Sequence, residues 1–204
     1  MFVLTETLAT MGGVYLLKKT FDRAPRRKVP LAGIVSPASG KVISIQTINP
    51  KEFTFIKKGV SNTVSLPGLG ARATMIVIEM NIRDVHVQRA PIAGRVVYSK
   101  HIAGKHKNVL HNKQKIDSFI ENEKSITVIE GDEFSVGVIQ VAGFVARRIT
   151  TKVRVGQKIK KGSIIGRISF GSQTILILPN SKKLAVSAGE RVTDGVTVFS
   201  LPQE

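Results

Sequence analysis

The sequence predicts an all-β or β-dominated domain preceded by a short N-terminal helix. Three observations predict this class of fold. Short runs rich in Val, Ile, Thr and Phe recur after Lys28, and Gly, Pro and Asn separate most of them. Two turn-and-strand segments resemble each other at a distance of 54 residues. A chain of 204 residues, 42% of them hydrophobic, is long and apolar enough for one domain with an appendage.

The expected strands are short and rich in β-branched residues, which favour a pleated and partly buried backbone. They are Lys41–Ile48, Met75–Met80, Arg95–Ser99, Ser125–Glu130, Phe134–Val141, Gly143–Thr150, Ile164–Phe170 and Gln173–Leu178. Within this β region, Asn112–Asn122 is the segment that most favours a helix.

Two of these strands follow a repeated turn. Ser36–Ile43 and Ala90–Val97 share the pattern P-x-x-G-basic-V, in which Pro fixes φ and Gly allows a tight bend. A third segment, Val153–Gly166, has the V-x-x-G rhythm that resembles barrel-sandwich proteins such as the biotinyl and lipoyl carriers. We therefore expect a barrel-sandwich-like domain with internal duplication.

The charge is concentrated in the first part of the chain. The net charge is +17, but the stretch from Ser172 to the end is neutral, so residues 1–171 carry the whole excess. Such an excess predicts an anionic partner. Basic residues cluster just after the mostly apolar stretch Met1–Leu17; they are Lys18, Lys19, Arg23, Arg26, Arg27 and Lys28.

Met1–Leu17 is short for a membrane span. As a helix it would reach about 25 Å, against about 30 Å of hydrocarbon core. Two interpretations remain open. The segment is an interfacial helix, or part of an anchor, whose basic cluster lies on anionic headgroups, or it is a helix packed on its own domain. The expected division is 1–28, membrane-proximal helix and basic cluster, and 29–204, β domain.

Few residues are candidates for chemistry. The absence of Cys excludes disulfides, Cys-ligated metals and thiol catalysis. If Asp84-Val-His86 is extended, the two side chains share a face, and the carboxylate can orient the imidazole as in a catalytic triad. The pair could also be two metal ligands or a surface ion pair; without a further His/Asp pair, no metal site is expected.

The pair Gly171-Ser172 separates two apolar β runs. Two Gly-Ser pairs occur in the chain and chance predicts about one, so the dipeptide alone is no signal. Gly at this place indicates a bulge or a close backbone approach, and a bulge with no further role is an equal interpretation. Three histidines, His101, His106 and His111, lie in a basic, Asn-rich segment.

Together these segments resemble the phosphatidylserine decarboxylases, especially the short variety that includes archaetidylserine decarboxylases. Phe21–Arg27 is similar to the family's F-R-D-P-x-R, and Val35–Val42 to V-S-P-A-D-G-K-V with Ser39 in place of Asp. Asp84–Pro91 falls on D-Y-H-R-x-H-x-P, but has Val87 for Arg and Arg89 for the second His.

Three further motifs follow in the family's order. Glu121–Lys124 resembles the N-E-R segment, and Gln140–Ile149 resembles I-A-G-x-V-A-R-R-I. Phe170-Gly-Ser-Gln-Thr is similar to the F-G-S-R self-cleavage site, with Gln173 in place of a usual Arg or Thr. The resemblance covers most of residues 15–180.

The resemblance implies a function and a cofactor. The chain is expected to cut itself between Gly171 and Ser172 into 1–171 and 172–204, and Ser172 is expected to become a pyruvoyl group. His86 is the expected base and Asp84 the group that orients it, with His111 as the competing base. The pyruvoyl ketone would condense with the amine of a serine phospholipid, phosphatidylserine or archaetidylserine, and accept the electrons released as carbon dioxide leaves.

The expected partners are the anionic serine phospholipid, the membrane surface, the chain's own cleaved fragment and, from the family, a second copy in a homodimer. We expect a membrane-associated protein on the cytoplasmic face that binds no nucleic acid. Three alternatives stay open: a non-enzymatic barrel-sandwich carrier, a basic RNA-binding β-protein and an uncleaved family member. Aromatic residues for base stacking are only 5% of the chain, which disfavours the RNA-binding alternative.

Overall fold

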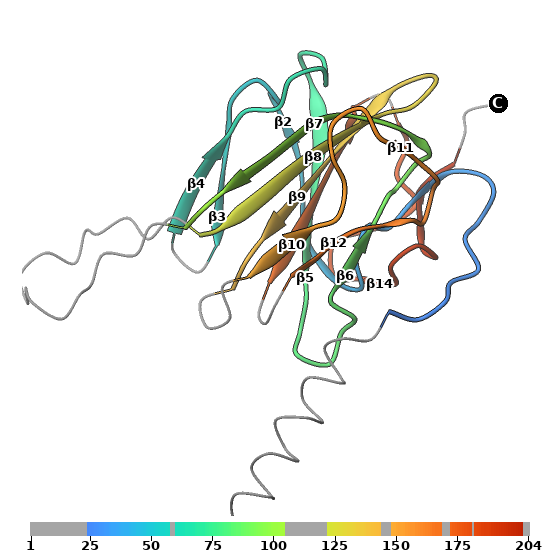
Figure 1. Cartoon of the computed structure of the whole chain (residues 1–204). Coiled ribbons are helices and arrows are strands. Elements are labelled where there is room, and N and C mark those ends of the chain that lie inside the picture. Colours follow the sequence, from blue (N-terminus) through green and yellow to red (C-terminus); the bar gives the residue numbers. More distant parts are fainter. Residues whose placement is uncertain are drawn as a thin grey trace, which may run out of the picture.

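The computed structural model describes residues 24–57, 60–104, 122–143, 148–168, 172–180 and 182–201. Within these ranges the chain is dominated by strands (Figure 1). They are β1 (Ile34–Val35), β2 (Gly40–Ile48), β3 (Phe53–Lys57), β4 (Val60–Val64), β5 (Ala73–Glu79), β6 (Val87–Arg89), β7 (Gly94–Ile102), β8 (Lys124–Glu130), β9 (Ser135–Val141), β10 (Ile149–Thr151), β11 (Lys158–Ile159), β12 (Ile164–Ile168), β13 (Gln173–Pro179), β14 (Arg191–Val192) and β15 (Val198–Ser200). The expected N-terminal helix, Met1–Leu17, lies outside the described residues, and so does the expected helix Asn112–Asn122 except for Asn122.

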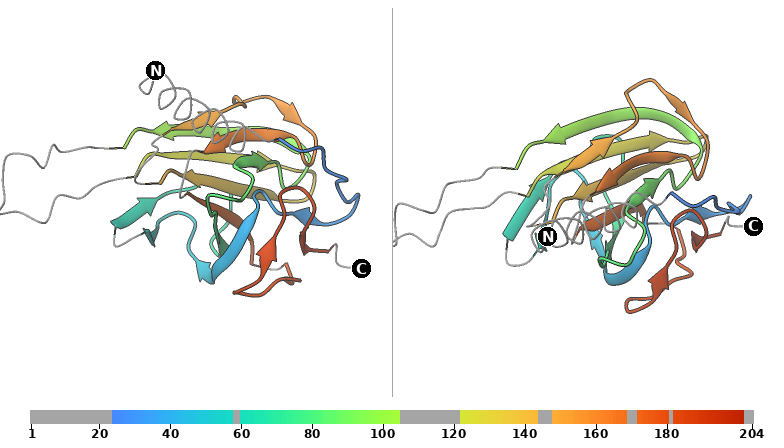
Figure 2. Two further views of the ribbon diagram at one scale, coloured as in Figure 1. Left: turned by 90° about the horizontal axis from the view of Figure 1, so that it is seen from below. Right: turned by 60° about the horizontal axis from the view of Figure 1, so that its bottom comes forward.

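The strands form one large sheet and three small ones. The large sheet has eight antiparallel strands in the order β11-β7-β8-β9-β13-β5-β2-β14, and it curls as a layer of the molecule (Figure 2). A three-stranded sheet has the order β10-β12-β6, while β1 pairs with β15 and β3 pairs with β4. The β-dominated class expected from the sequence is confirmed.

The central strands β5, β8, β9 and β13 of the large sheet are buried on both faces, whereas β2 and β7 are partly exposed. Side chains alternate along each strand, so successive residues point to opposite faces. On β13, Thr174, Leu176 and Leu178 share one face, and Ile175 and Ile177 share the other. The first face belongs to a core that includes residues of β10 and β12. The second face packs with the hairpin β3–β4. The fold is therefore a sandwich with the large sheet in the middle.

The large sheet is symmetric about the contact between β9 and β13. Reading outward, β8, β7 and β11 on one side correspond to β5, β2 and β14 on the other. The repeated turns lead into β2 and β7 at Gly40 and Gly94, where a Cβ atom would overlap the carbonyl oxygens of Glu79 and Glu130. Both strands also shift register two residues later. The expected internal duplication is confirmed.

The V-x-x-G rhythm is duplicated as well. Val153–Gly162 runs through β11, and Val186–Gly195 runs through β14 at the other edge of the sheet. Gly162 and Gly195 both have positive φ, of 79° and 67°, which favours glycine. Their N–H groups donate to the carbonyls of the first residues of the two repeated turns, Ala90 and Ser36.

Two segments of the candidate site differ in detail from interpretations that the sequence left open. The segment from Asn81 to Asp84 is a turn, closed by the hydrogen bond from Asp84 N to Asn81 O of 3.0 Å, and is not extended. The apolar runs on either side of Gly171-Ser172 are strands of different sheets, β12 and β13, so the interruption is a passage between sheets instead of a bulge within one strand.

A buried ion cluster joins Arg27, near the start of the described chain, to Asp194, near its end, and to Arg89 of β6. Asp194 is fully buried and accepts hydrogen bonds from Arg27 Nη2 at 2.5 Å, Arg89 Nε at 2.7 Å and Ser39 Oγ at 2.6 Å. Arg89 also donates to the carbonyl of Gly162 at 2.9 Å. Two of these residues, Ser39 and Arg89, are departures from the family motifs, and both contact the same carboxylate.

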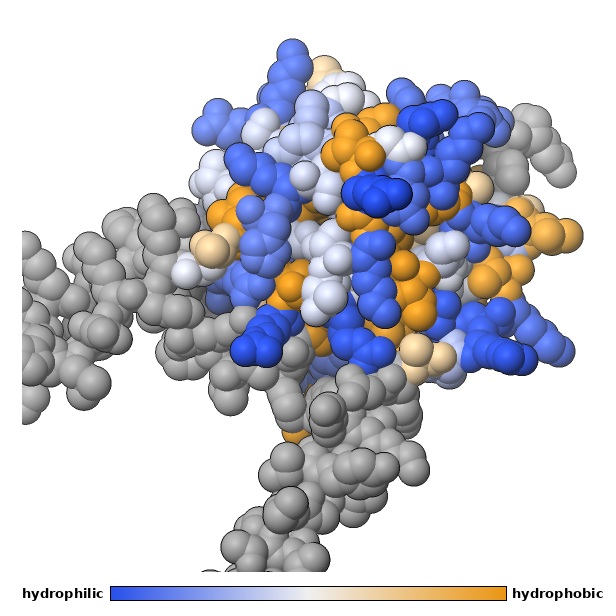
Figure 3. Space-filling model, in the orientation of Figure 1, coloured by the Kyte–Doolittle hydropathy of each residue, from blue (hydrophilic) through white to orange (hydrophobic). Residues whose placement is uncertain are grey.

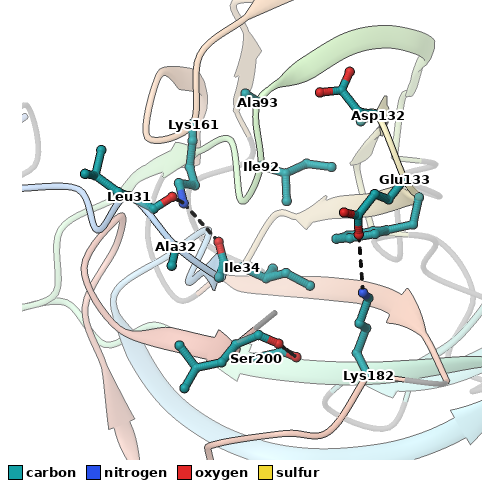
Figure 4. Close-up of a pocket in the computed structure, with 14 residues that line it drawn as sticks. Leu31, Ala32, Ile34, Ile92, Ala93, Asp132, Glu133, Lys161, Lys182 and Ser200 are labelled. Carbon is teal, nitrogen blue, oxygen red and sulfur yellow. Dashed lines mark hydrogen bonds and ion pairs between the residues drawn. The ribbon is translucent and has the colours of Figure 1, made fainter. Parts of the chain in front are cut away.

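A cleft of about 350 Å³ lies beside the turn between β8 and β9 (Figure 4). Lys182 Nζ lies 3.8 Å from Glu133 Oε2 and 4.4 Å from the centre of the Phe134 ring. Lys161 Nζ donates to the carbonyls of Leu31 and Gly33, and burial lowers the pKa of this lysine. Phe134 precedes β9, whereas Ser172 precedes the antiparallel β13, so the cleft is at the opposite end of the sheet from Ser172.

Candidate active site

The interior of the sandwich becomes polar at the end where β13 begins. Leu178 and Leu176 are followed on the same face by Thr174, and Gln140 on β9 lies directly opposite Thr174. Gln88 on β6, a strand of the three-stranded sheet, adds a third polar side chain to this end of the interior. Thr174, Gln140 and Gln88 are all buried. Buried polar groups need hydrogen-bond partners. Thr174 and Gln88 share one such partner, the sulfur of Met80, with Ser172.

Ser172 is fully buried at the start of this central strand. Its hydroxyl donates to Met80 Sδ at 3.5 Å, and its carbonyl accepts from Met80 N at 3.0 Å. Thr174 Oγ1 donates to the same sulfur, also at 3.5 Å. A thioether is a weak acceptor. The backbone of residue 172 is therefore held firmly, while its hydroxyl is held by a weak bond.

His86 is buried and is oriented by a backbone group. Its Nδ1 lies 2.7 Å from the carbonyl oxygen of Asp84. Because a carbonyl only accepts, Nδ1 carries the hydrogen, and in the neutral ring the lone pair is on Nε2. The Asp84 carboxylate does not fill this role: it accepts from Asn81 N at 2.7 Å and from Arg191. The backbone carbonyl of Asp84 therefore orients the His86 ring in place of the Asp84 carboxylate, which closes the turn at Asn81.

Gln88 connects the imidazole segment to Met80. Its Nε2 donates to His86 O at 3.3 Å and lies 3.6 Å from Met80 Sδ. Gln140 Nε2 in turn donates to Gln88 Oε1 at 2.8 Å. The structure thus gathers Ser172, Met80, the two glutamines and the backbone of His86 in one cluster. The hydrogen-bond partner of the Ser172 hydroxyl in this cluster is Met80, not His86.

The predicted site residues have different outcomes. Ser172, Asp84 and His86 lie at the same end of the sandwich, whereas Gly171 and His111 are outside the described residues. Of the basic cluster, Arg26 and Lys28 are exposed and Arg27 binds Asp194. Lys18, Lys19 and Arg23 are also outside the described residues.

Sequence reasoning missed Met80, Gln88 and Gln140, because none of them titrates or matches a catalytic pattern. One signal could have found Gln140. On β9 the positions Val136, Val138 and Gln140 point the same way, so a glutamine stands where alternation calls for an apolar side chain.

The fold and the site define a duplicated β sandwich with a buried serine at the head of a central strand. Comparison with known proteins identifies the family. The sequence profile described as phosphatidylserine decarboxylase matches residues 19–200. The chain belongs to the phosphatidylserine decarboxylase family.

Relatives in archaea and bacteria agree with this assignment. A Methanocaldococcus jannaschii protein, provisionally named an archaetidylserine decarboxylase proenzyme, is 38% identical over 89% of this chain and 87% of its own length. A similarly named Methanothermobacter thermautotrophicus protein is 41% identical over 88% of this chain and 76% of its own length. The phosphatidylserine decarboxylase proenzyme of Erythrobacter litoralis is 37% identical over 98% of this chain and 79% of its own length.

Proposed function

We propose that this protein is the precursor of a pyruvoyl-dependent decarboxylase. Its substrate is a serine phospholipid, phosphatidylserine or archaetidylserine, and its product is the corresponding ethanolamine phospholipid. The observation that carries the proposal is the position of Ser172, buried at the head of the central strand β13 in a chain of this family. The proenzyme names of the relatives support self-processing.

The chain cuts itself between Gly171 and Ser172. The Ser172 hydroxyl attacks the Gly171 carbonyl carbon, so a C–O bond forms and the peptide C–N bond breaks. Loss of the Ser172 Cα proton and cleavage of its Cβ–O bond then leave a carboxylate on Gly171 and a dehydroalanine. Water hydrolyses the imine form of this residue and ammonia leaves, which makes residue 172 the pyruvoyl group of the fragment 172–204.

His86 is the base for the first step, since a hydroxyl attacks poorly unless its proton is removed. The carbonyl of Asp84 holds Nδ1–H, which leaves the basic lone pair on Nε2. Breaking the bond from the Ser172 hydroxyl to Met80 costs little because sulfur is a weak acceptor. A rotation of this side chain away from Met80 therefore precedes the attack.

The residues around position 172 fit a pyruvoyl group. The Ser172 hydroxyl, which conversion removes, donates only to a thioether, so its loss leaves no strong acceptor unpaired. The carbonyl of residue 172 is retained in the pyruvoyl group and stays bonded to Met80 N. When formed, the group supplies a ketone that binds the substrate amine and withdraws the electrons left by carbon dioxide.

The cleaved fragment 172–204 stays with the rest of the chain. Its strand β13 lies between β9 and β5 in the large sheet, and β14 and β15 pair with β2 and β1. Asp194 adds the buried contacts to Arg27 and Arg89. The first partner of fragment 172–204 is therefore fragment 1–171.

We place the protein on the anionic cytoplasmic face of the membrane, where its substrate lies. Within the described residues, no helix is both long and apolar enough to span a bilayer. Arg26 and Lys28 are exposed and free to approach headgroups, each adding about 1 kcal/mol of attraction. Hydrophilic side chains also cover much of the face in Figure 3, with apolar ones between them.

The test is the intact mass of the purified protein and of its Ser172→Ala variant. We expect two fragments from the parent, one ending at Gly171 and one starting at residue 172 that is lighter by one ammonia than a Ser terminus. The Ser172→Ala variant should stay intact. Vesicles containing phosphatidylserine or archaetidylserine then give the preferred substrate.

The outcomes separate the proposal from its alternatives. An uncut parent chain would overturn self-processing and leave the uncleaved family member. An intact chain that carries biotin or lipoate would support the carrier. Cleavage without release of carbon dioxide from either lipid would overturn the substrate assignment alone.

A further inference from the structure

Gln140 has a buried oxygen without a hydrogen-bond partner among the described residues. The side chain is 1% exposed, and its Oε1 accepts nothing there. Its orientation follows from its neighbours. Gln88 faces the carbonyl of His86, so that atom of Gln88 must be the amide nitrogen, and its oxygen faces Gln140. Gln140 Nε2 therefore donates to Gln88 Oε1, and Gln140 Oε1 is left as a hydrogen-bond acceptor without a donor among the described residues.

The fold does not require polar residues at this place. The symmetry of the large sheet relates Gln140 to Leu178 and Thr174 to Val136. Through the repeated turns it relates Gln88 to Ile34. All three counterparts are buried and apolar. One end of the duplicated sandwich thus fills these positions with hydrocarbon, and the symmetry-related end, where Ser172 lies, fills them with hydrogen-bonding groups.

Gly166 makes room for the Gln140 amide. A Cβ atom at Gly166 would lie 2.6 Å from Gln140 Nε2 and 2.8 Å from its Oε1. This glycine has no positive φ in the structure, so its backbone does not demand glycine. The same Cβ would also lie 2.8 Å from the carbonyl oxygen of Thr150, so Gly166 makes room both for the paired strand and for the amide of Gln140.

Gln140 can reach a group bound at residue 172. It lies opposite Thr174, and opposed residues have Cβ atoms about 5 Å apart. Residue 172 lies two positions before Thr174, about 7 Å along the chain. A glutamine side chain covers part of that distance, and a headgroup bound at residue 172 covers the rest. The missing partner of the Gln140 oxygen is a donor.

We infer that Gln140 Oε1 accepts a hydrogen bond from the amino group of the substrate's headgroup. Gln140 is then a substrate-binding residue that selects aminated headgroups and sets the position of the nitrogen beside residue 172. Gln88 holds the amide in the required orientation. The inference rests on the proposed function, which supplies an amine as the reacting group.

Calorimetric titration of the cleaved protein tests this role. The two probes are glycerophosphoethanolamine, which has an amino group, and glycerophosphoglycerol, which does not. In Gln140→Leu, which installs the counterpart residue, the first probe should bind about tenfold more weakly. The second probe should bind as it does to the parent protein.

Two further variants sharpen the test. Gln140→Glu keeps an acceptor oxygen and should retain binding of the amino probe. Thr127→Val removes another buried, unpartnered oxygen on the same sheet face and should leave both probes unaffected. If Gln140→Leu does not fold, Gln140→Glu decides alone, and loss of the amino probe there overturns the inference.

Failure of the inference and of the proposed function are distinguishable by mass. An uncut parent chain overturns the proposed function. A cleaved Gln140→Leu protein that binds the amino probe like the parent, or that loses both probes equally, overturns only the role of Gln140, because its oxygen then holds a water or a purely structural contact.

Discussion

Replacing Asp194 by Asn should strongly destabilise the protein. The carboxylate is fully buried and holds Arg27, Arg89 and Ser39. Asn keeps the volume but turns an amide N–H toward a guanidinium, and it leaves Arg89, which is 7% exposed, without its counter-charge. Removing one partner of a buried ion pair costs about 3–5 kcal/mol. We expect a loss of that size in the free energy of unfolding.

The assay is urea unfolding followed by far-UV circular dichroism, since the chain has no Trp. It is done in Ser172→Ala, so that the chain stays in one piece. Asp132→Asn, the same change at an exposed position, is the control and should shift stability by less than about 0.5 kcal/mol. If Asp194→Asn loses no more than this control, the ion cluster does not stabilise the fold.

A second substitution, Ser39→Asp, tests whether the lost charge causes the destabilisation in Asp194→Asn. Ser39 Oγ lies 2.6 Å from the Asp194 carboxylate, and the family motif has Asp at position 39. Ser39→Asp should therefore restore part of the stability lost in Asp194→Asn, because the two arginines regain a nearby carboxylate. A coupling of about 1–3 kcal/mol is expected between the two positions. Strictly additive effects would refute the view that the charge, and not the packing, matters.

Three other predictions follow from single contacts. His86→Gln should slow self-cleavage by about 100-fold or more in a mass-resolved time course, since it removes the base; cleavage at the parent rate would assign the base elsewhere. Gly94→Ala should cost about 2–3 kcal/mol in urea unfolding because the new Cβ overlaps the Glu130 carbonyl, and an unchanged midpoint would contradict that close approach. Combined Arg26→Ala and Lys28→Ala should weaken binding to anionic vesicles without lowering stability; unaltered sedimentation with vesicles would remove them from the membrane surface.

Strands with alternating or continuous apolar residues could be predicted from the sequence. β2, β5, β8, β9 and β13 lie within one or two residues of their expected ranges, because each pairs on both sides and its pattern is set by burial. The hairpin β3–β4 was missed, since its exposed face carries Thr54 and Thr63 and its signal is weak. The expected strand Gly143–Thr150 overlaps β10 at Ile149 and Thr150, and residues 144–147 lie outside the described residues.

The site could be predicted in part. Ser172 and His86 came from residue types that do chemistry and from motifs that resemble a family, and the structure puts them at the same end of the sandwich. The contact between Asp84 and His86 could not be predicted. The Asp84 carboxylate binds Asn81 N within a turn, so the backbone carbonyl of Asp84 contacts the His86 ring instead. Gln88 and Gln140 depend on sheet register across the sandwich, which no local pattern contains.

The duplicated fold holds residue 172 at the start of β13, directly after the bond that we propose is cut. In one half Gly131 N donates to Phe134 O within the turn that joins β8 to β9. The corresponding bond in the other half runs from Met80 N to Ser172 O, between residues far apart in sequence. Because β12 and β13 lie in different sheets, a cut before Ser172 breaks no strand pairing among the described residues, and the ladder to β5 and β9 keeps the new end in place. In the proposed mechanism, the reactive group made from Ser172 is positioned by the sheet itself.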